Sequence, residues 1–253
     1  MRQNFTIAGP FGKLSGVINL CEEELGRRHV LVMAHGFRGS MDGAGRAAAL
    51  ADEIGENICS VVRFNFSWCT KLSNQVAELK AVLDFVRETM RPEKVFLLGR
   101  SFGGATCIVT ACGGEDAYRP YGMVLWSAPN SLKQTFIQVL GEDTFQEALH
   151  GKTIVLDDER GHDEIPAAFV TDLFHYNVAE LLKKWKKGPL LIIHGENDTT
   201  VTPDQAKENF EIAGGEKQLC YMAGDNHHLD LCFKEAGELV KNWLERNILK
   251  DEF

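Results

Sequence analysis

The stretch from Lys94 to Ala105 constrains the fold of this chain more than any other. A short apolar run ends there in the pattern Gly99-x-Ser101-x-Gly103, and small residues that favour a closely packed helix follow. This pattern predicts a strand, a very tight turn and a helix, with the central serine held in a strained backbone conformation at the end of a sheet. Glycine and serine are also common in ordinary turns, so the rest of the chain must decide between the two interpretations.

Apolar runs and helical patterns alternate on both sides of this stretch. Runs typical of buried strands are found at 29–34, 61–66, 122–127, 190–194 and 218–222, and an edge hairpin is expected at 5–8 and 14–18. Helical spacing is found at about 45–54, 76–86, 203–212 and 233–248. The alternation predicts an α/β fold, with a mostly parallel sheet flanked by helices on both faces. Ligands bind such sheets at the carboxyl ends of the strands.

Residues 128–188 interrupt this alternation. Apolar spacing predicts helices at about 132–140 and 168–185, and the acidic run at 157–164 between them is expected to be a solvated loop. A simple crossover between two strands needs far fewer residues. We therefore expect a core formed by 1–127 and 189–253, with 128–188 as a small helical cap or lid over the strand ends.

Three of the expected strands end in residues with complementary chemistry. Ser101 follows one strand, Asp198 lies in the loop after the strand at 190–194, and His227 lies after the strand at 218–222. A serine hydroxyl is a poor nucleophile at neutral pH. It needs a base to accept its proton, and the base needs an acid to orient it. These three side chains could supply the parts.

The three residues lie in motifs that resemble those of the α/β-hydrolases, and the resemblance covers nearly the whole chain. Ser101 lies in Gly-x-Ser-x-Gly, Asp198 in a loop that matches H-G-x-x-D-x-x-V-x-P, and His227 in a loop similar to G-x-x-H-x-F. The resemblance implies an α/β-hydrolase fold, in which Ser101 is the nucleophile, Asp198 the acid and His227 the base.

The loop His35-Gly36-Phe37 resembles the oxyanion loop of the same family. By this resemblance, the backbone N–H groups of Phe37 and Phe102 would form the oxyanion hole. Within the family, the chain is most similar to bacterial carboxylesterases of the cinnamoyl or feruloyl type, which carry a short helical insertion. It departs from that group directly before the nucleophile, where Arg100 stands in place of the usual histidine. That departure bears on the substrate and not on the three catalytic candidates.

The resemblance implies a serine esterase that cleaves small carboxylic esters, including aromatic or cinnamoyl-type ones, through an acyl-enzyme and without a cofactor. Fold and catalytic residues do not separate an esterase from a peptidase, a thioesterase or a C–C bond hydrolase. A non-catalytic binding protein of the same fold is a further alternative. Trp68 and Tyr176 are candidates for lining the substrate pocket, although packing explains either of them equally well.

The remaining histidines need separate interpretations. Motif spacing favours His227 over its neighbour His228 as the base. His35 and His194 precede glycines at strand ends, where hydrogen bonding within a loop is the expected role. A metal site formed by His227, His228 and Asp230 is an alternative, but no usual zinc-ligand spacing supports it. We therefore expect no metal.

Composition limits which binding partners and which cellular compartment we expect for this protein. The chain of 253 residues carries a net charge of -9 without a compensating basic cluster, which argues against nucleic acid as a partner. It shows neither a signal-peptide core nor a run of transmembrane length, and its seven cysteines are scattered. We expect a cytoplasmic protein with reduced thiols, a small-molecule ester as substrate and no membrane partner. A homodimer is compatible with the sequence.

Overall fold

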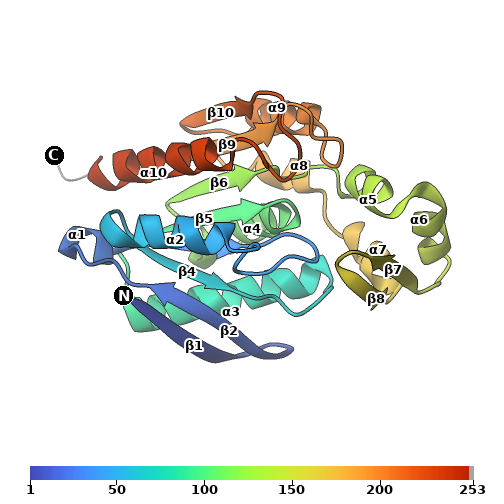
Figure 1. The fold of residues 1–253 in the computed structure, drawn as a ribbon, viewed down its shortest axis with the longest axis horizontal. Helices are drawn as coiled ribbons and strands as arrows, with labels where there is room; N and C mark the ends of the chain where they lie inside the picture. The colour runs from blue at the N-terminus through green and yellow to red at the C-terminus, as the bar shows by residue number, and fades with distance from the viewer. Residues whose placement is uncertain (251–253) are drawn as a thin grey trace.

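The computed structural model describes residues 1–250 and has an eight-stranded sheet at its centre (Figure 1). The strands are β1 (Arg2–Gly9), β2 (Gly12–Asn19), β3 (His29–Ala34), β4 (Ser60–Phe64), β5 (Lys94–Arg100), β6 (Gly122–Trp126), β9 (Leu190–Gly195) and β10 (Lys217–Met222). Their order is β1-β2-β4-β3-β5-β6-β9-β10. β1 and β2 form an antiparallel edge hairpin, β2 is also antiparallel to β4, and the strands β4, β3, β5, β6, β9 and β10 are parallel to one another. The predicted α/β fold class is confirmed.

Helices cover both faces of this sheet (Figure 1). They are α1 (Glu24–Arg27), α2 (Arg46–Asn57), α3 (Leu72–Met90), α4 (Phe102–Cys112), α9 (Pro203–Ile212) and α10 (Phe233–Leu249), with a short 3₁₀ turn η1 (Asp116–Tyr118). Apolar side chains of α2 and α10 pack on one face, and those of α3, α4 and α9 pack on the other. The carboxyl ends of the parallel strands remain as the edge at which a site can form.

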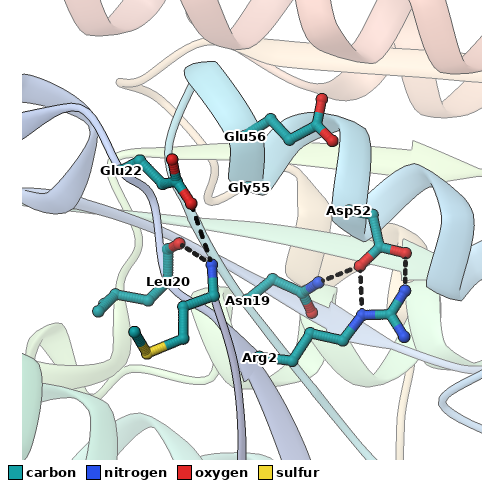
Figure 2. Close-up of a pocket in the computed structure, with 8 residues that line it drawn as sticks. Arg2, Asn19, Leu20, Glu22, Asp52, Gly55 and Glu56 are labelled. Atoms are coloured by element: carbon teal, nitrogen blue, oxygen red, sulfur yellow. Dashed lines mark hydrogen bonds and ion pairs between the residues drawn. The ribbon is translucent and has the colours of Figure 1, made fainter.

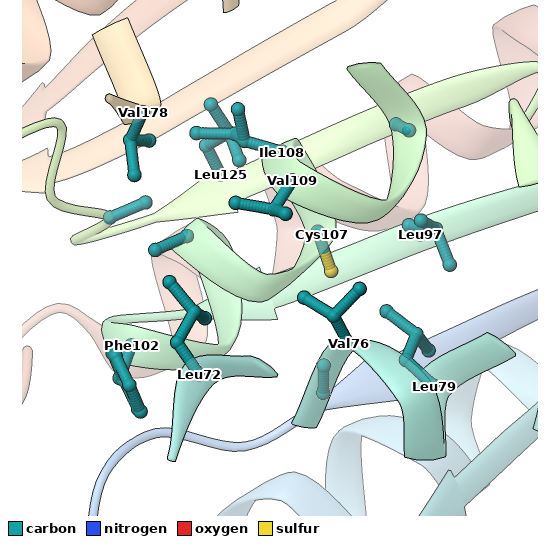
Figure 3. Close-up of a cluster of buried hydrophobic side chains, with 14 of the residues drawn as sticks. Leu72, Val76, Leu79, Leu97, Phe102, Cys107, Ile108, Val109, Leu125 and Val178 are labelled. Atoms are coloured by element: carbon teal, nitrogen blue, oxygen red, sulfur yellow. The ribbon is translucent and has the colours of Figure 1, made fainter. Parts of the chain in front are cut away.

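The central strands are apolar along their whole length because both of their faces are buried. In β3, Val30 and Val32 belong to the cluster under α3 and α4, while Leu31 and Met33 belong to the cluster under α2 and α10. Figure 3 shows the first of these clusters, in which side chains of α3 and α4 interdigitate above β5 and β6. Each fully buried Val or Leu contributes about 1.5–3 kcal/mol to folding. Burial of both faces therefore explains why these strands appear in the sequence as continuous apolar runs and not as alternating ones.

The segment 128–188 joins β6 to β9, which are neighbours in the sheet. It contains α5 (Leu132–Leu140), α6 (Glu142–Leu149), β7 (Ile154–Asp158), β8 (Gly161–Ile165), α7 (Ala168–Leu173) and α8 (Val178–Leu182). Buried side chains of its helices, such as Phe136, Phe169 and Val178, belong to the same cluster as those of α3 and α4. The segment is therefore packed onto the core through an apolar contact.

Two expectations for this segment were wrong. The acidic run at 157–164 is part of an antiparallel hairpin, β7–β8, and not a solvated loop. Its shape is held by Asp158 and Asp163, which accept hydrogen bonds from Arg38 of the core. The single helix expected at 168–185 is two short helices, because Asn177 interrupts it and caps α8 by accepting the N–H of Glu180 at 3.1 Å.

Across residues 1–250, no helix is both long and apolar enough to cross a membrane. All seven cysteines fall within this described range, and none of them forms a disulfide there. Burial raises the pKa of the Cys59 and Cys107 thiols well above its usual value, which makes these two groups unreactive packing side chains.

Candidate active site

Ser101 lies in the tight turn between β5 and α4. Its φ of 52° and ψ of −125° are unusual for a residue other than glycine, so the backbone is strained at this position. The backbone N–H of Ser101 donates to the carbonyl oxygen of Trp126 at 2.8 Å, which fixes the turn to the neighbouring strand β6. The serine is thereby held at the carboxyl end of the sheet.

Close packing around this turn explains its two glycines. A Cβ on Gly99 would lie 2.5 Å from the carbonyl oxygen of Gly103, and a Cβ on Gly103 would lie 2.3 Å from that of Ala34. Backbone atoms cannot move aside as the end of a flexible side chain can, so neither position accepts a larger residue. The motif in the sequence therefore reflects a steric requirement of the turn.

Asp198 follows β9, and its carboxylate is buried. Oδ1 accepts the backbone N–H groups of Thr200 and Val201, each at 2.9 Å. Burial alone would raise the pKa of Asp198, but hydrogen bonds from His194 and His227 outweigh it and hold the pKa below its usual value. Asp198 is therefore a rigidly held, ionised acceptor at the end of its strand.

His227 lies in the loop after β10. Asp225 organises this loop, because its buried carboxylate accepts three backbone N–H groups from it. The His227 ring has two partners: Nδ1 is 2.7 Å from Asp198 Oδ2, and Nε2 is 2.9 Å from Ser101 Oγ. The three residues, which come from three different strand ends, are thus in one hydrogen-bonded row.

The row is arranged so that a proton can leave the serine. An ionised Asp198 only accepts, so the proton on the neutral His227 ring is assigned to Nδ1. Nε2 then carries the lone pair that faces the Ser101 hydroxyl. At 2.9 Å the two atoms are within the distance required of a general base and the proton it removes. The carboxylate would stabilise the imidazolium that results.

Two backbone N–H groups adjoin the serine and have no protein acceptor. They belong to Phe37, in the loop after β3, and to Phe102, the first residue of α4; within residues 1–250 neither one donates a hydrogen bond. Gly36 brings the first loop close, because a Cβ there would lie 3.1 Å from Ser101 Cβ. The N-terminal end of α4 adds a partial positive charge beside Phe102. Both N–H groups are available to a developing oxyanion.

The sequence of the chain matches a known family. A model of the prolyl oligopeptidase family matches residues 68–235, which is more than half of the chain and includes Ser101, Asp198 and His227. The chain belongs to the prolyl oligopeptidase family. No curated protein sequence matches this family member significantly.

Solved structures similar to this prolyl oligopeptidase family member are α/β-hydrolases, which confirms the resemblance found in the sequence. Est1E from Butyrivibrio proteoclasticus is 19% identical, with a TM-score of 0.81 and coverage of 97% of this chain and 98% of that one. A second Est1E structure, with ferulic acid bound, also matches. A monoacylglycerol lipase from Paleococcus ferrophilus is 18% identical, with a TM-score of 0.68 and coverage of 98% and 99%. At this identity the matches establish the shared fold.

Trp68 and Tyr176, the candidates for lining the pocket, both lie where the core of this family member meets the segment 128–188. The exposed Trp68 donates its indole N–H to Asp163 of β8. The half-buried Tyr176 donates its hydroxyl to Ser73 Oγ at 3.0 Å, near the start of α3. Each has a partner across the contact, and their role in substrate binding stays a prediction.

Arg38 is a residue of this site that the sequence did not reveal. It follows Phe37 directly, and its side chain is only 3% exposed. Nε lies 2.6 Å from Asp163 Oδ2 and Nη1 lies 2.6 Å from Asp158 Oδ2, so the loop that carries the Phe37 N–H is tied to the hairpin β7–β8. The only signals in the sequence are a basic residue after the oxyanion loop and an acidic run far downstream, and nothing in the sequence pairs them.

A cluster of aromatic rings adjoins the two available N–H groups. Phe37 packs against Phe102, Phe136 and Phe169, with ring centroids between 5.2 and 6.4 Å apart. Phe102, Phe136 and Phe169 are fully buried, whereas Phe37 is half-buried. The cluster joins α4 to α5 and α7 and presents Phe37 as an apolar wall beside the serine.

His228, the competitor of His227, has different neighbours. Its Nδ1 lies 2.9 Å from Arg100 Nη2, and its Nε2 lies 3.3 Å from Arg160 Nη2. The metal alternative finds no support, since the described part of the chain contains no group of three acidic, histidine or cysteine ligands able to hold an ion. Asp230 instead pairs with Arg46 at 3.1 Å.

Another hollow lies at the start of the chain, between β1, β2 and α2 (Figure 2). Its donors are paired with other groups of the hollow: Arg2 and Asn19 both donate to Asp52, and the Met1 amino group donates to the carbonyl of Leu20. The hollow therefore presents no convergent set of donors to a ligand, and it contains none of the residues of the Ser101 site.

Proposed function

We propose that this chain is a serine ester hydrolase in which Ser101 is the nucleophile, His227 the general base and Asp198 the acid. One observation carries the proposal: the 2.9 Å contact between Ser101 Oγ and His227 Nε2, made at a strained turn and continued by the 2.7 Å contact between His227 and Asp198. A serine that is only structural would not need a base with its own buried carboxylate.

In this proposal His227 takes the Ser101 proton while Oγ attacks the ester carbonyl. The carbonyl oxygen becomes an oxyanion, to which the N–H groups of Phe37 and Phe102 donate. The C–O bond to the alcohol then breaks, and the imidazolium gives its proton to the leaving oxygen. Water, deprotonated by the same imidazole, attacks the acyl-serine and releases the carboxylic acid and Ser101.

The acyl group is proposed to be small and apolar or aromatic. Phe37 supplies one of the two N–H groups and its ring is only partly buried, so we propose that this ring contacts the group attached to the reacting carbonyl. The ferulic acid bound in one Est1E structure fits such an acyl group. This is support by analogy, since Est1E shares 17–19% of its residues with this chain.

A second candidate is a peptidase with the same nucleophile, and the match to the prolyl oligopeptidase family model favours it. The chemistry differs in the leaving group, because an amine is a much poorer leaving group than an alcohol. Matched ester, thioester and amide substrates with one common acyl group would separate the candidates. The ester hydrolase proposal expects kcat/KM for the ester to exceed that for the amide by several orders of magnitude.

The test of the proposal uses two serines at strand ends. Ser101→Ala should lower kcat/KM for a small aromatic ester by about 10⁴-fold or more while leaving the fold intact. Ser127→Ala is the matched control, because Ser127 follows β6, is buried and also has a positive φ, of 49°. The control should keep most of the activity. An active Ser101→Ala protein would overturn the assignment.

A further inference from the structure

Arginine side chains gather around His228, directly beside the Ser101 site. Arg100 precedes the serine, Arg160 lies in the turn between β7 and β8, and Arg46 begins α2. Arg100 and Arg160 each reach one ring nitrogen of His228, at 2.9 and 3.3 Å, and Arg46 donates to its backbone carbonyl at 3.3 Å. In a chain with a net charge of -9, this gathering of positive charge is a local feature.

The donors in this cluster outnumber the acceptors. Burial and the positive charge of Arg100 lower the pKa of His228, so its ring is neutral at neutral pH. A neutral imidazole has one acceptor nitrogen and one N–H, so it cannot accept from Arg100 and Arg160 at once. In addition, Nε of Arg100 is buried without an acceptor anywhere in residues 1–250. At least two guanidinium N–H groups therefore lack a partner.

The nearby carboxylates have other arginine partners. Asp230 pairs with Arg46, and Asp158 and Asp163 both pair with Arg38, although Asp158 also accepts the backbone N–H of Arg160. Burial, reinforced by Arg46, lowers the pKa of Arg100 to about 10, so the guanidinium is still charged at neutral pH but is held unfavourably. An anion placed here would accept from the guanidinium N–H that His228 cannot pair with, and its negative charge would offset that cost.

The cluster lies beside His227, the residue that would protonate the leaving alcohol. In the proposed reaction His227 must give its proton to the leaving oxygen, so the alcohol part of the ester lies against that ring. The ring of His228 is 5.5 Å from the ring of His227, centroid to centroid. The apolar wall formed by Phe37 adjoins the oxyanion N–H groups instead. The two parts of the ester would therefore meet different chemistry.

We propose that Arg100, Arg160 and His228 form a subsite for an anionic group, a carboxylate or a phosphate, on the alcohol part of the ester. This inference rests on the proposed function and specifies its substrate class: a small apolar or aromatic acyl group esterified to an acidic alcohol or phenol. The guanidinium groups of Arg100 and Arg160 bind the anion, and the neutral His228 ring lies between them and accepts a hydrogen bond from one of the two.

The test compares acetyl esters whose leaving groups differ in charge: 4-acetoxybenzoate, 4-acetoxyphenyl phosphate and the neutral methyl 4-acetoxybenzoate. The measured quantity is the ratio of kcat/KM for each anionic ester to kcat/KM for the neutral one, in the wild type and in Arg160→Gln. Comparing the ratio between proteins cancels the intrinsic reactivity of each ester. Arg160→Gln should lower the ratio about tenfold, mainly through KM for the anionic ester. The anion with the larger loss identifies whether carboxylate or phosphate is preferred.

The matched control is Arg119→Gln. It makes the same change in net charge, but Arg119 is exposed and precedes β6, at the amino ends of the strands. The ratio should stay at the wild-type value in this control. An unchanged ratio in Arg160→Gln would overturn the proposed subsite. An equal fall of the ratio in both variants would also overturn it, because the loss of one positive charge anywhere on the protein would explain that result.

A binding measurement separates this inference from the proposed function. Calorimetry with Ser101→Ala should detect benzoate or phenyl phosphate but not benzyl alcohol, and adding Arg160→Gln should weaken anion binding about tenfold. Anion binding without any ester hydrolysis in the wild type would refute the proposed function and leave the anion site standing. Ester hydrolysis without anion binding or charge preference would refute the subsite alone.

Discussion

The two adjacent histidines of this site belong to differently constructed surroundings. His227 contacts Ser101 and Asp198, and all three residues are placed by the ends of strands in the core. His228 contacts Arg160, which the hairpin β7–β8 brings in from the segment 128–188. The first environment is fixed by backbone hydrogen bonds and a tight turn, whereas the second depends on contacts between long side chains.

The difference indicates how chemistry and substrate choice are divided in this molecule. Backbone groups of strand ends are held by the whole sheet, so they can keep reacting atoms within a few tenths of an ångström. Side-chain contacts between the core and the segment 128–188 can change without disturbing the sheet. We therefore expect substitutions around His227 to act on turnover and those around His228 to act on substrate preference.

The largest expected effect is that of His227→Ala. Without the imidazole, nothing accepts the Ser101 proton, so kcat for small esters should fall by about 10⁵-fold or more. Thermal unfolding should change little, since the ring is near the surface, with 12% exposed. Steady-state kinetics with a sensitive chromogenic ester measures the loss. If His227→Ala kept a tenth of the wild-type activity, His227 could not be the general base, and the contrast between the two histidines would be wrong.

Asp198→Asn should have the next largest effect. An amide in this position can donate to Nδ1 of His227, which would favour the wrong tautomer and place the proton on Nε2. We expect kcat to fall about 10³–10⁴-fold with little change in KM. Glu196→Gln is the control, because it also replaces a carboxylate by an amide, on an exposed residue of the same loop. We expect kcat to change little in this variant.

Arg38→Gln tests the link between the two environments. It removes the ion pairs that tie the Phe37 loop to Asp158 and Asp163 of the hairpin. Because an oxyanion donor is sensitive to small displacements, we expect kcat to fall about tenfold and the urea midpoint of unfolding to decrease. Arg119→Gln, with the same loss of charge on the surface, should change neither quantity.

The smallest expected effect is that of His228→Ala. The change leaves Ser101, Asp198 and His227 untouched, but it removes the ring that lies between Arg100 and Arg160. We expect kcat/KM to fall only a few-fold, with the change in KM and not in kcat. Full inactivation of a folded His228→Ala protein beside an active His227→Ala protein would reverse the assignment of the base.

The fold could be predicted closely from the sequence where apolar periodicity determines it. The buried strands were located within one or two residues, and the helix expected at 203–212 is α9, with the same bounds. The hairpin β7–β8 was missed, because Asp157–Glu164 has no apolar alternation that would mark a strand. The break between α7 and α8 also escaped prediction, since it contains neither proline nor glycine and is set by the cap at Asn177.

The residues of the site also fall into those that could be predicted from the sequence and those that could not. Ser101, Asp198 and His227 could be brought together from sequence because parallel strands end at one edge of the sheet, although their roles remain a proposal. Arg38, Arg100 and Arg160 could not be assigned partners, since each contact joins side chains more than 60 residues apart in the chain. No periodicity links such residues. The contacts of Arg38 and Arg160 also depend on how the segment 128–188 packs onto the core.

The central claim is that Ser101 is made nucleophilic by His227, and labelling with a fluorophosphonate tests it most directly. The reagent forms a stable bond only with an activated serine, and mass spectrometry of the digested protein identifies the modified residue. We predict one label per molecule, on Ser101, with a rate that is unchanged in Ser127→Ala and at least 10³-fold lower in His227→Ala. Labelling of a different serine, or equally fast labelling of Ser101 without His227, would contradict the account.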